Sequence, residues 1–170
     1  IDPIREEMVM SLRTYVGASK NLLSETPEHC RKVEILQPLL CNEQLAKLKH
    51  IDQSQLKAKA LDTLFGAGGG AGELEKGLDQ LCRAAKDAVN EGNSLLILSD
   101  RNADTDHAAI PSLLATAAVH HSLIRDGLRA KAEIIVESGD VSETHHLATL
   151  IGYGAAAVNP YVAIETLKVM

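Results

Sequence analysis

The sequence predicts an α/β fold, with a mainly parallel β-sheet of about four or five strands flanked by helices. Residues 95–98 form a short aliphatic run that ends just before the charged pair Asp100 and Arg101. Because this run shows no alternation of apolar and polar residues, it is typical of a strand buried on both faces, as in parallel sheets. A second such run, at residues 134–136, follows after a helix-length gap. The repetition is typical of βαβ units, and we expect residues 95–98 to form the central strand.

Composition favours one domain with an aliphatic core. The chain has 170 residues, of which 45% are hydrophobic and 2% aromatic, so aliphatic side chains must do the packing and a stacking platform for bases is not expected. The net charge of -6 comes without clustered Lys and Arg, which argues against nucleic acid. Three cysteines without a C-x-x-C pair favour a reducing compartment, and no apolar run approaches the roughly 20 residues that span a membrane. Because the chain starts at Ile1 rather than Met, we expect it to be part of a longer protein.

The chain divides into an amino-terminal part, residues 1–42, and a β/α core, residues 43–170. Apolar residues at helical spacing predict an amphipathic helix over residues 4–16, ended by Gly17. The apolar stripe of this helix needs a surface to cover.

An irregular segment is predicted over residues 18–37, because this stretch is polar and only weakly periodic. Such segments in a compact domain usually wrap another surface. Thr26 and Pro27 predict the start of one helical turn within it. A short strand is expected near residues 33–36.

The core continues with alternating helices and strands, read from periodicity, capping residues and glycine positions. Before the central strand we predict a helix over 43–50 capped by Asn42, an edge strand over 61–65 and a helix over 73–90. After the central strand we predict helices over 112–125, 145–151 and 161–170, which alternate with strands over 133–137 and 155–159.

A glycine-rich run at residues 66–72 lies between a predicted strand and a predicted helix. Loops of this kind bind phosphate in dinucleotide-binding proteins, and Gly66, Gly68 and Ala71 fit the loosest form of that fingerprint. No Lys-Ser or Lys-Thr pair follows, however, and the acid expected about 20 residues further on is Asp87, which falls within a helix. We favour the alternative, a flexible loop that tolerates changes in length.

Polar side chains follow three of the predicted strands. Asp100 and Arg101 come just after the central strand, while Glu137 and Asn159 end two others. Because the carboxyl ends of parallel strands meet at one edge, where α/β folds hold their ligands, we expect these residues to share a rim that holds a ligand or a neighbouring domain. The alternative is local: Asp100 and Arg101 pair with each other or cap helices, and residues 138–140 supply a turn.

Two pairs of adjacent histidines, His120-His121 and His145-His146, fall within predicted helices. Neighbours on a helix point about 100° apart, so neither pair can chelate one ion as His residues four apart can. His121 lies seven residues from a leucine on either side, which places it on the predicted core stripe and leaves His120 facing solvent or a partner. A metal site assembled from both pairs is the less favoured alternative.

Several stretches, taken in order, resemble one known family. They are Met10-Ser11-Leu12, Tyr15-Val16-Gly17, Asn21-Leu22-Leu23, Glu25-Thr26-Pro27-Glu28-His29, Ile97-Leu98-Ser99-Asp100-Arg101, Ile110-Pro111-Ser112-Leu113-Leu114-Ala115, Ala118-Val119-His120-His121, Leu123-Ile124-Arg125 with Gly127-Leu128, Val136-Glu137-Ser138-Gly139, His145-His146, Gly152-Tyr153-Gly154-Ala155 and Val158-Asn159-Pro160-Tyr161. Over nearly the whole chain, they resemble the central domain of the glutamate synthase large chain.

The resemblance implies a role inside a larger oxidoreductase that acts on CH-NH2 donors. In that family an amidotransferase domain hydrolyses glutamine, and the ammonia passes internally to a flavin domain. There it adds to 2-oxoglutarate, and the imine is reduced with electrons from FMN and an iron-sulphur cluster. The central domain, similar to a degenerate partial β/α barrel, is implied to position those two domains and to help enclose the ammonia route. It is implied to have no catalytic residue, cofactor or metal of its own.

The cysteines depart from the active domains of that family. The amidotransferase nucleophile is a Cys at the mature amino terminus, and the cluster ligands are closely spaced cysteines. Cys30, Cys41 and Cys82 match neither arrangement.

Our candidate interdomain contacts are four strand-end residues and one histidine, together with the irregular segment of residues 21–29. The five are Asp100, Arg101, His120, Glu137 and Asn159. The alternative function is a stand-alone α/β protein that binds a phosphorylated small molecule at residues 66–72 or at the rim, and a third class is a homo-oligomer formed through the first helix. The resemblance implies bacterial cytoplasm or plastid, and leaves ferredoxin, NADPH and NADH open as electron donors.

Overall fold

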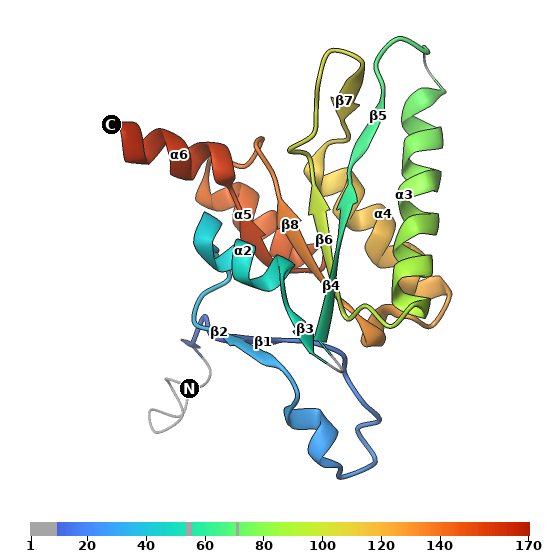
Figure 1. The fold of residues 1–170 in the computed structure, drawn as a ribbon, viewed down its shortest axis with the longest axis vertical. Coiled ribbons are helices and arrows are strands. Elements are labelled where there is room, and N and C mark those ends of the chain that lie inside the picture. The colour runs from blue at the N-terminus through green and yellow to red at the C-terminus, as the bar shows by residue number, and fades with distance from the viewer. Residues whose placement is uncertain (1–9, 54–55, 71) are drawn as a thin grey trace.

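The structure is a computed structural model that describes residues 10–53, 56–70 and 72–170 (Figure 1). Its main sheet has the strand order β3-β4-β6-β8-β9, in which β4, β6, β8 and β9 are parallel and β3 pairs antiparallel with β4. The predicted α/β class with a mainly parallel sheet of four or five strands is therefore confirmed. The strands are β3 (Asp52–Gln53), β4 (Leu56–Asp62), β6 (Leu95–Ser99), β8 (Glu133–Glu137) and β9 (Ala155–Asn159).

The predicted central strand is the middle strand of this sheet. All five residues of β6 are buried, because β4 and β8 flank it and both faces are covered. Its side chains alternate between two cores: Leu96 and Leu98 join one, and Leu95 and Ile97 join the other. An unbroken aliphatic run is thus what a strand between two apolar layers requires.

Three helices cover one face of the sheet. They are α3 (Glu73–Asn90), α4 (Ser112–Arg125) and α5 (Thr144–Gly152), and each connects two successive parallel strands. Residues from all three helices pack in the core of Leu96 and Leu98. Consecutive strands that are neighbours, with every crossover helix on one face, form the arrangement of a β/α barrel arc rather than of a doubly wound sheet.

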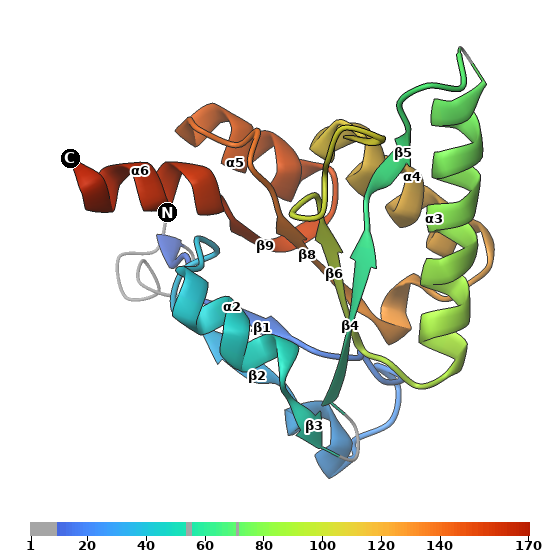
Figure 2. The same cartoon turned by 45° about the horizontal axis from the view of Figure 1, so that its top comes forward.

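The other face, which would point into a barrel, is covered by the amino-terminal part together with helix α2 (Figure 2). Helix α2 (Asn42–Lys49) contributes Leu45 and Leu48 to the core of Leu95 and Ile97. A two-stranded sheet of β1 (Thr14–Val16) and β2 (Val33–Ile35) contributes Val16 and Ile35. The inner face of the arc is therefore filled by the chain itself.

The amino-terminal helix predicted over residues 4–16 is wrong over residues 11–16, of which residues 11–13 form neither helix nor strand. Residues 14–16 form β1, because β2 offers it a partner 19 residues away and Val16 becomes fully buried there. Residues 4–9 lie outside the described residues. The strand predicted near residues 33–36 is confirmed as β2, and the predicted helical turn is confirmed as the 3-10 helix η1 (Pro27–Cys30) with Thr26 as its N-cap.

The predicted edge strand over residues 61–65 divides into two strands of different sheets. Residues up to Asp62 belong to β4 of the main sheet, whereas β5 (Leu64–Gly66) pairs antiparallel with β7 (His107–Ala109). Sequence reasoning missed this pair because its two strands have three residues each and lie far apart in the chain.

The helix predictions in the core are largely confirmed. Helices α3, α4 and α5 lie where periodicity placed them, and α6 (Tyr161–Val169) follows β9. Helix α2 begins one residue earlier than predicted, since Cys41 rather than Asn42 is its N-cap. A further 3-10 helix, η2 (Arg129–Lys131), leads into β8.

Candidate functional site

The carboxyl ends of β6, β8 and β9 form a compact polar cluster, which we call the rim. Most of its side chains are buried, including Glu137 at 2% exposure and Asn159 at 0%. Burial of so many polar groups requires that they satisfy one another. The rim consists of Ser99, Asp100, Arg101, Glu137, Ser138 and Asn159.

Glu137 accepts hydrogen bonds from three side chains. Lys49 Nζ lies 2.7 Å from its Oε2, Ser99 Oγ donates to the same oxygen at 2.6 Å, and Arg101 Nε donates to Oε1 at 2.6 Å. Burial raises the pKa of Glu137, but the hydrogen bonds from Lys49, Ser99 and Arg101 outweigh it and leave the pKa below its ordinary value. Glu137 is therefore held as a carboxylate.

Asp100 binds the loop that follows β8. Ser138 Oγ donates to Asp100 Oδ2 at 2.5 Å, and the Gly139 amide donates to the two carboxylate oxygens at 3.1 and 2.9 Å. Burial, followed by the charge and hydrogen bonding of Asp100, raises the pKa of Tyr161 to about 12. Asp100 thus ties the β8 loop to the start of α6.

Asn159 connects the rim to the amino-terminal part. Its Nδ2 donates to the Leu40 carbonyl at 2.9 Å and to Asn42 Oδ1 at 3.0 Å. Its Oδ1 is buried and has no hydrogen-bond partner among the described residues. The side chain therefore anchors the segment before α2.

Arg101 reaches from the rim toward α6. Its guanidinium lies 4.1 Å from the centroid of the Tyr161 ring, and its Nη2 lies 3.6 Å from Glu165 Oε1. Lys49 and Arg101 both pair with Glu137, and Asp100 is held by the Ser138 hydroxyl and the Gly139 amide. Chemically, this is an ion-paired network that holds elements together, because its carboxylates and cations already have partners.

The structure brings together four of the five candidate contacts. Asp100, Arg101, Glu137 and Asn159 meet at the rim, as the strand-end argument predicted. His120 does not join them: its Nδ1 accepts a hydrogen bond from Arg129 Nε at 3.0 Å, near the amino-terminal ends of β8 and β9. Burial, then the charge of Arg129, lowers the pKa of His120.

The predicted orientation of the first histidine pair is wrong. His121 is exposed and His120 is partly buried. The buried face of α4 includes Ala115, Val119 and Leu123, whereas Leu114 is 40% exposed. Spacing from Leu114 therefore identified the wrong face.

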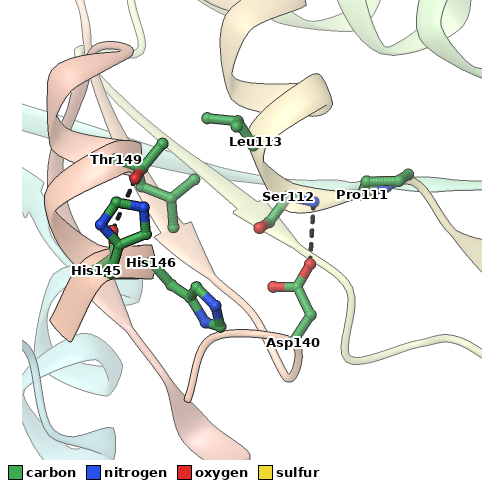
Figure 3. A pocket seen from close by; sticks show the side chains of 8 residues that line it. Pro111, Ser112, Leu113, Asp140, His145, His146 and Thr149 are labelled. Atoms are coloured by element: carbon green, nitrogen blue, oxygen red, sulfur yellow. Dashed lines mark hydrogen bonds between the residues drawn. The ribbon is translucent and has the colours of Figure 1, made fainter. Parts of the chain in front are cut away.

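The second histidine pair lines a cavity of about 310 Å³ between the starts of α4 and α5 (Figure 3). Asp140 Oδ2 accepts a hydrogen bond from the Ser112 amide at 3.3 Å, and His145 and His146 face it from α5. All three charged or titratable residues here are exposed. Across the part of the chain that the structure describes, there is no group of three or more His, Cys, Asp or Glu residues that could hold a metal ion.

The glycine-rich run begins at the end of β5, which pairs with β7 and does not belong to the main sheet. Residues 67–70 form no helix or strand, as predicted for a loop. Glu73 and Glu75 occupy the first turn of α3, where their carboxylates face the positive end of the helix dipole. A phosphate bound at this helix end would be repelled by the two carboxylates.

Sequence reasoning missed three residues that complete the rim. Lys49 ends α2 and contacts Glu137 across 88 residues of sequence, and Tyr161 and Glu165 belong to α6. No local pattern marks them. The one usable signal is that a buried strand-end carboxylate requires a cationic partner, of which the chain has several.

The described residues contain no helix that is long and apolar enough to cross a membrane.

Comparison with known proteins identifies the family of this chain. The family model for the glutamate synthase central domain matches residues 1–170.

Relatives are 41–46% identical over almost the whole chain. The glutamate synthase [NADPH] large chain of Bacillus subtilis is 46% identical over 99% of this chain and 11% of its own length. Glutamate synthase [NADH] of Schizosaccharomyces pombe is 41% identical over 98% of this chain and 8% of its own length. Ferredoxin-dependent glutamate synthase 1, chloroplastic/mitochondrial, of Arabidopsis thaliana is 43% identical over 99% of this chain and 10% of its own length. The chain spans about a tenth of the length of these relatives. It belongs to the glutamate synthase central domain family.

Proposed function

We propose that this chain is the structural spacer of a glutamate synthase large chain. It positions the glutamine amidotransferase and FMN-binding domains and helps enclose the route by which ammonia passes between them. The observation that supports this is the closed rim. At the edge where β/α folds hold substrates, Glu137 is bound by Lys49, Arg101 and Ser99, and Asp100 by Ser138 and Gly139.

A rigid spacer suits the chemistry of a transferred intermediate. Ammonia that escapes or is protonated is lost, so its transfer needs a fixed distance and a closed path. The rim supports rigidity because it joins β6, β8, β9, α2 and α6 through side chains from each.

The cofactors of the parent enzyme belong, in this proposal, to its other domains. FMN and the iron-sulphur cluster supply the electrons for reduction of the imine formed from 2-oxoglutarate and ammonia. The parent enzyme works in bacterial cytoplasm or in a plastid. Relatives whose names state NADPH, NADH or ferredoxin are about equally similar to this chain, so similarity of this domain does not select the electron donor.

The test uses the full-length large chain with Arg101→Gln. Loss of the Arg101 contacts to Glu137, Tyr161 and Glu165 should loosen the spacer, so less glutamate forms per glutamine consumed while glutamine hydrolysis continues. The matched control is Arg83→Gln, since Arg83 is exposed on α3 and its Nε donates to the Asp79 carbonyl of its own helix. An unchanged ratio in a folded Arg101→Gln enzyme would contradict the proposal.

The alternative, a stand-alone protein that binds a phosphorylated small molecule, receives no support from the geometry. The glycine-rich run contacts Glu73, and the rim cations are already paired. Calorimetric titration with FMN, NADPH, ATP and 2-oxoglutarate separates the two functions. Stoichiometric, micromolar binding of any of them at this domain would favour the alternative.

A further inference from the structure

Arg129 joins η2 to three other elements at the amino-terminal edge of the main sheet, opposite the rim. Its Nε donates to His120 Nδ1 on α4 at 3.0 Å, and its Nη1 donates to the Ala132 carbonyl at 2.6 Å. Both terminal nitrogens donate to Glu133 Oε2 at 3.1 Å, and Nη2 also donates to the Gly154 carbonyl at 3.0 Å. All five N–H groups of the guanidinium are thereby used.

The hydrogen bond between Arg129 and His120 requires a neutral imidazole. An arginine N–H can only donate, so His120 Nδ1 must be the acceptor and carry no proton. A protonated imidazole donates from both of its nitrogens and has no acceptor to offer. Protonation of His120 therefore breaks this bond and leaves two cations in contact, because a guanidinium in a protein stays charged.

The imidazole of His120 also packs against the backbone of Gly154. A Cβ placed on Gly154 would overlap three atoms of the ring. Gly154 has a φ of +111° and lies in the turn between α5 and β9, where its amide donates to the Ile151 carbonyl at 3.0 Å. A change at His120 therefore reaches this turn in two ways, through the packed ring and through Arg129, which binds the Gly154 carbonyl.

The charged and titratable groups around His120 favour the neutral ring. Arg129 approaches from η2, and the nearby carboxylate of Glu133 on β8 already binds both terminal nitrogens of that guanidinium. On α4 itself, the exposed ring of His121 lies edge-on to the ring of His120, with centroids 5.2 Å apart. Burial, followed by the charges of Arg129 and His121, lowers the pKa of His120 from its ordinary value of 6.5.

We propose that His120 and Arg129 form an acid-sensitive latch, which holds η2 and the turn between α5 and β9 against α4 while His120 is neutral and releases them when His120 is protonated. The inference goes beyond the proposed function and does not depend on it, because the latch and the rim lie at opposite edges of the sheet.

The direction of the pH effect follows from the two states of the latch. When the latch opens, His120 regains solvent and moves away from Arg129, so the open state binds a proton more readily than the closed state. The closed state is therefore fully favoured above pH 6.5 and loses this advantage as the pH falls through the lower pKa of His120 in the closed state. Acidification loosens one edge of the domain.

The experiment is hydrogen–deuterium exchange, read by mass spectrometry, on the full-length large chain between pH 8 and pH 5. The reference is His120→Asn, because the side-chain carbonyl of Asn can accept the Arg129 hydrogen bond at every pH and does not titrate. The segments to read are residues 128–132 and 152–155, whose sequences are the same in both enzymes. Their intrinsic exchange chemistry therefore cancels in the ratio of the two rates.

We expect the ratio of the wild-type rate to the His120→Asn rate to rise about tenfold from pH 8 to pH 5, which is the effect of losing one hydrogen bond to a charged group. An imperfect fit of the Asn would offset the ratio at every pH without changing this trend. The control is His121→Asn, which replaces the adjacent exposed histidine and should keep the wild-type rise. A ratio that stays constant with pH, or a rise that His121→Asn abolishes, would overturn the latch.

A second measurement needs no variant. Exchange of the imidazole C2 hydrogen, followed by mass spectrometry across the same pH range, reports the protonation of individual histidines in the unmodified enzyme. His120 should titrate below pH 6.5, and the amide exchange of residues 152–155 should rise over the same pH interval. A midpoint for His120 at or above 6.5, or amide exchange that rises in a different interval, would contradict the inference.

Discussion

Glu137 is the residue on which the rim depends. Its carboxylate ends β8 with 2% exposure and contacts Lys49, which ends α2, and Arg101, which follows β6. Removing one member of a buried ion pair usually costs more than the pair contributes, because the remaining charges lose their partner. Here that cost is reduced, since the side chains of Lys49 and Arg101 are 30% and 37% exposed and keep part of their hydration.

We predict that Glu137→Gln lowers the free energy of unfolding by about 2 kcal/mol at neutral pH, below the 3–5 kcal/mol of a fully buried pair. The pKa of Glu137 is lower in the folded than in the unfolded chain, so the unfolded state binds more protons and the ion pair stabilises the fold above the ordinary pKa of 4.5. This contribution is lost as the pH falls below that value. Urea unfolding from pH 7 to 3 should show a gap between wild type and variant that closes on acidification, and a pH-independent gap would contradict the assignment.

No residue with a side chain can replace Gly154 without strain. Its φ is +111°, and a Cβ there would overlap the imidazole of His120, which Arg129 Nε holds by its hydrogen bond. We predict that Gly154→Ala destabilises the domain by about 2–4 kcal/mol. Gly152→Ala is the control, because nothing lies within 4 Å of its Cβ position, and should be neutral or stabilising by about 0.5 kcal/mol. Thermal unfolding of both variants measures the difference.

At the scale of elements, α3 and β5 approach each other through one glycine. A Cβ on Gly77 would lie 2.9 Å from Phe65 Cβ and 3.1 Å from the Leu64 carbonyl oxygen. The close approach explains why a helix interior contains a residue with low helix propensity.

We predict that Gly77→Ala destabilises the domain by up to about 2 kcal/mol, because the steric cost of roughly 1–3 kcal/mol is offset by a gain of about 1 kcal/mol in helix propensity. Gln80→Ala, an exposed change on the same helix, should have almost no effect. Chemical denaturation of the two variants tests this, and a more stable Gly77→Ala protein would show that β5 moves aside at little cost.

Hydrophobic periodicity sufficed to predict those helices and strands whose buried residues form a pattern within the element itself. Helix α3 and the strands β6 and β8 have unbroken apolar stripes or runs, so their positions follow from the sequence. The pairing of β5 with β7 and of β1 with β2 depends on partners 17 or more residues away, and no local pattern specifies it.

The rim was predictable in part for the same reason. Strand ends in a parallel sheet must meet, so Asp100, Arg101 and Glu137 were expected to be neighbours. Lys49 was not expected to join them, because the position of its side chain depends on how α2 crosses the inner face of the sheet. The orientation of His120 and His121 was predicted wrongly because Leu114, from which the spacing was counted, is exposed, whereas the buried face of α4 carries Ala115, Val119 and Leu123.

At the scale of the whole molecule, the amino-terminal segment completes the second core. Val16 is fully buried against the face of the sheet that includes Leu95 and Ile97. The boundary near residue 42 therefore separates two parts of one packed unit, and we expect both to unfold together.

We predict that Val16→Asp lowers the free energy of unfolding by about 3–5 kcal/mol, since it buries an unpaired charge. The loss should appear as one shifted transition by both fluorescence of an introduced probe and circular dichroism. Leu12→Asp is the control, because Leu12 is 67% exposed, and should change stability by no more than about 0.5 kcal/mol. Two separate transitions would instead show that residues 1–42 and 43–170 unfold independently.

The bond from Asn159 to the Leu40 carbonyl joins residues 119 apart in the chain. During synthesis at about 5–20 residues per second, the ribosome needs roughly 6–24 s to add the strand that accepts the amino-terminal segment. For that time Leu40 and the neighbouring backbone have no strand to pair with. The last strand of the sheet, rather than the first, therefore sets the moment at which a nascent chain can close this domain and become resistant to proteases and independent of chaperones.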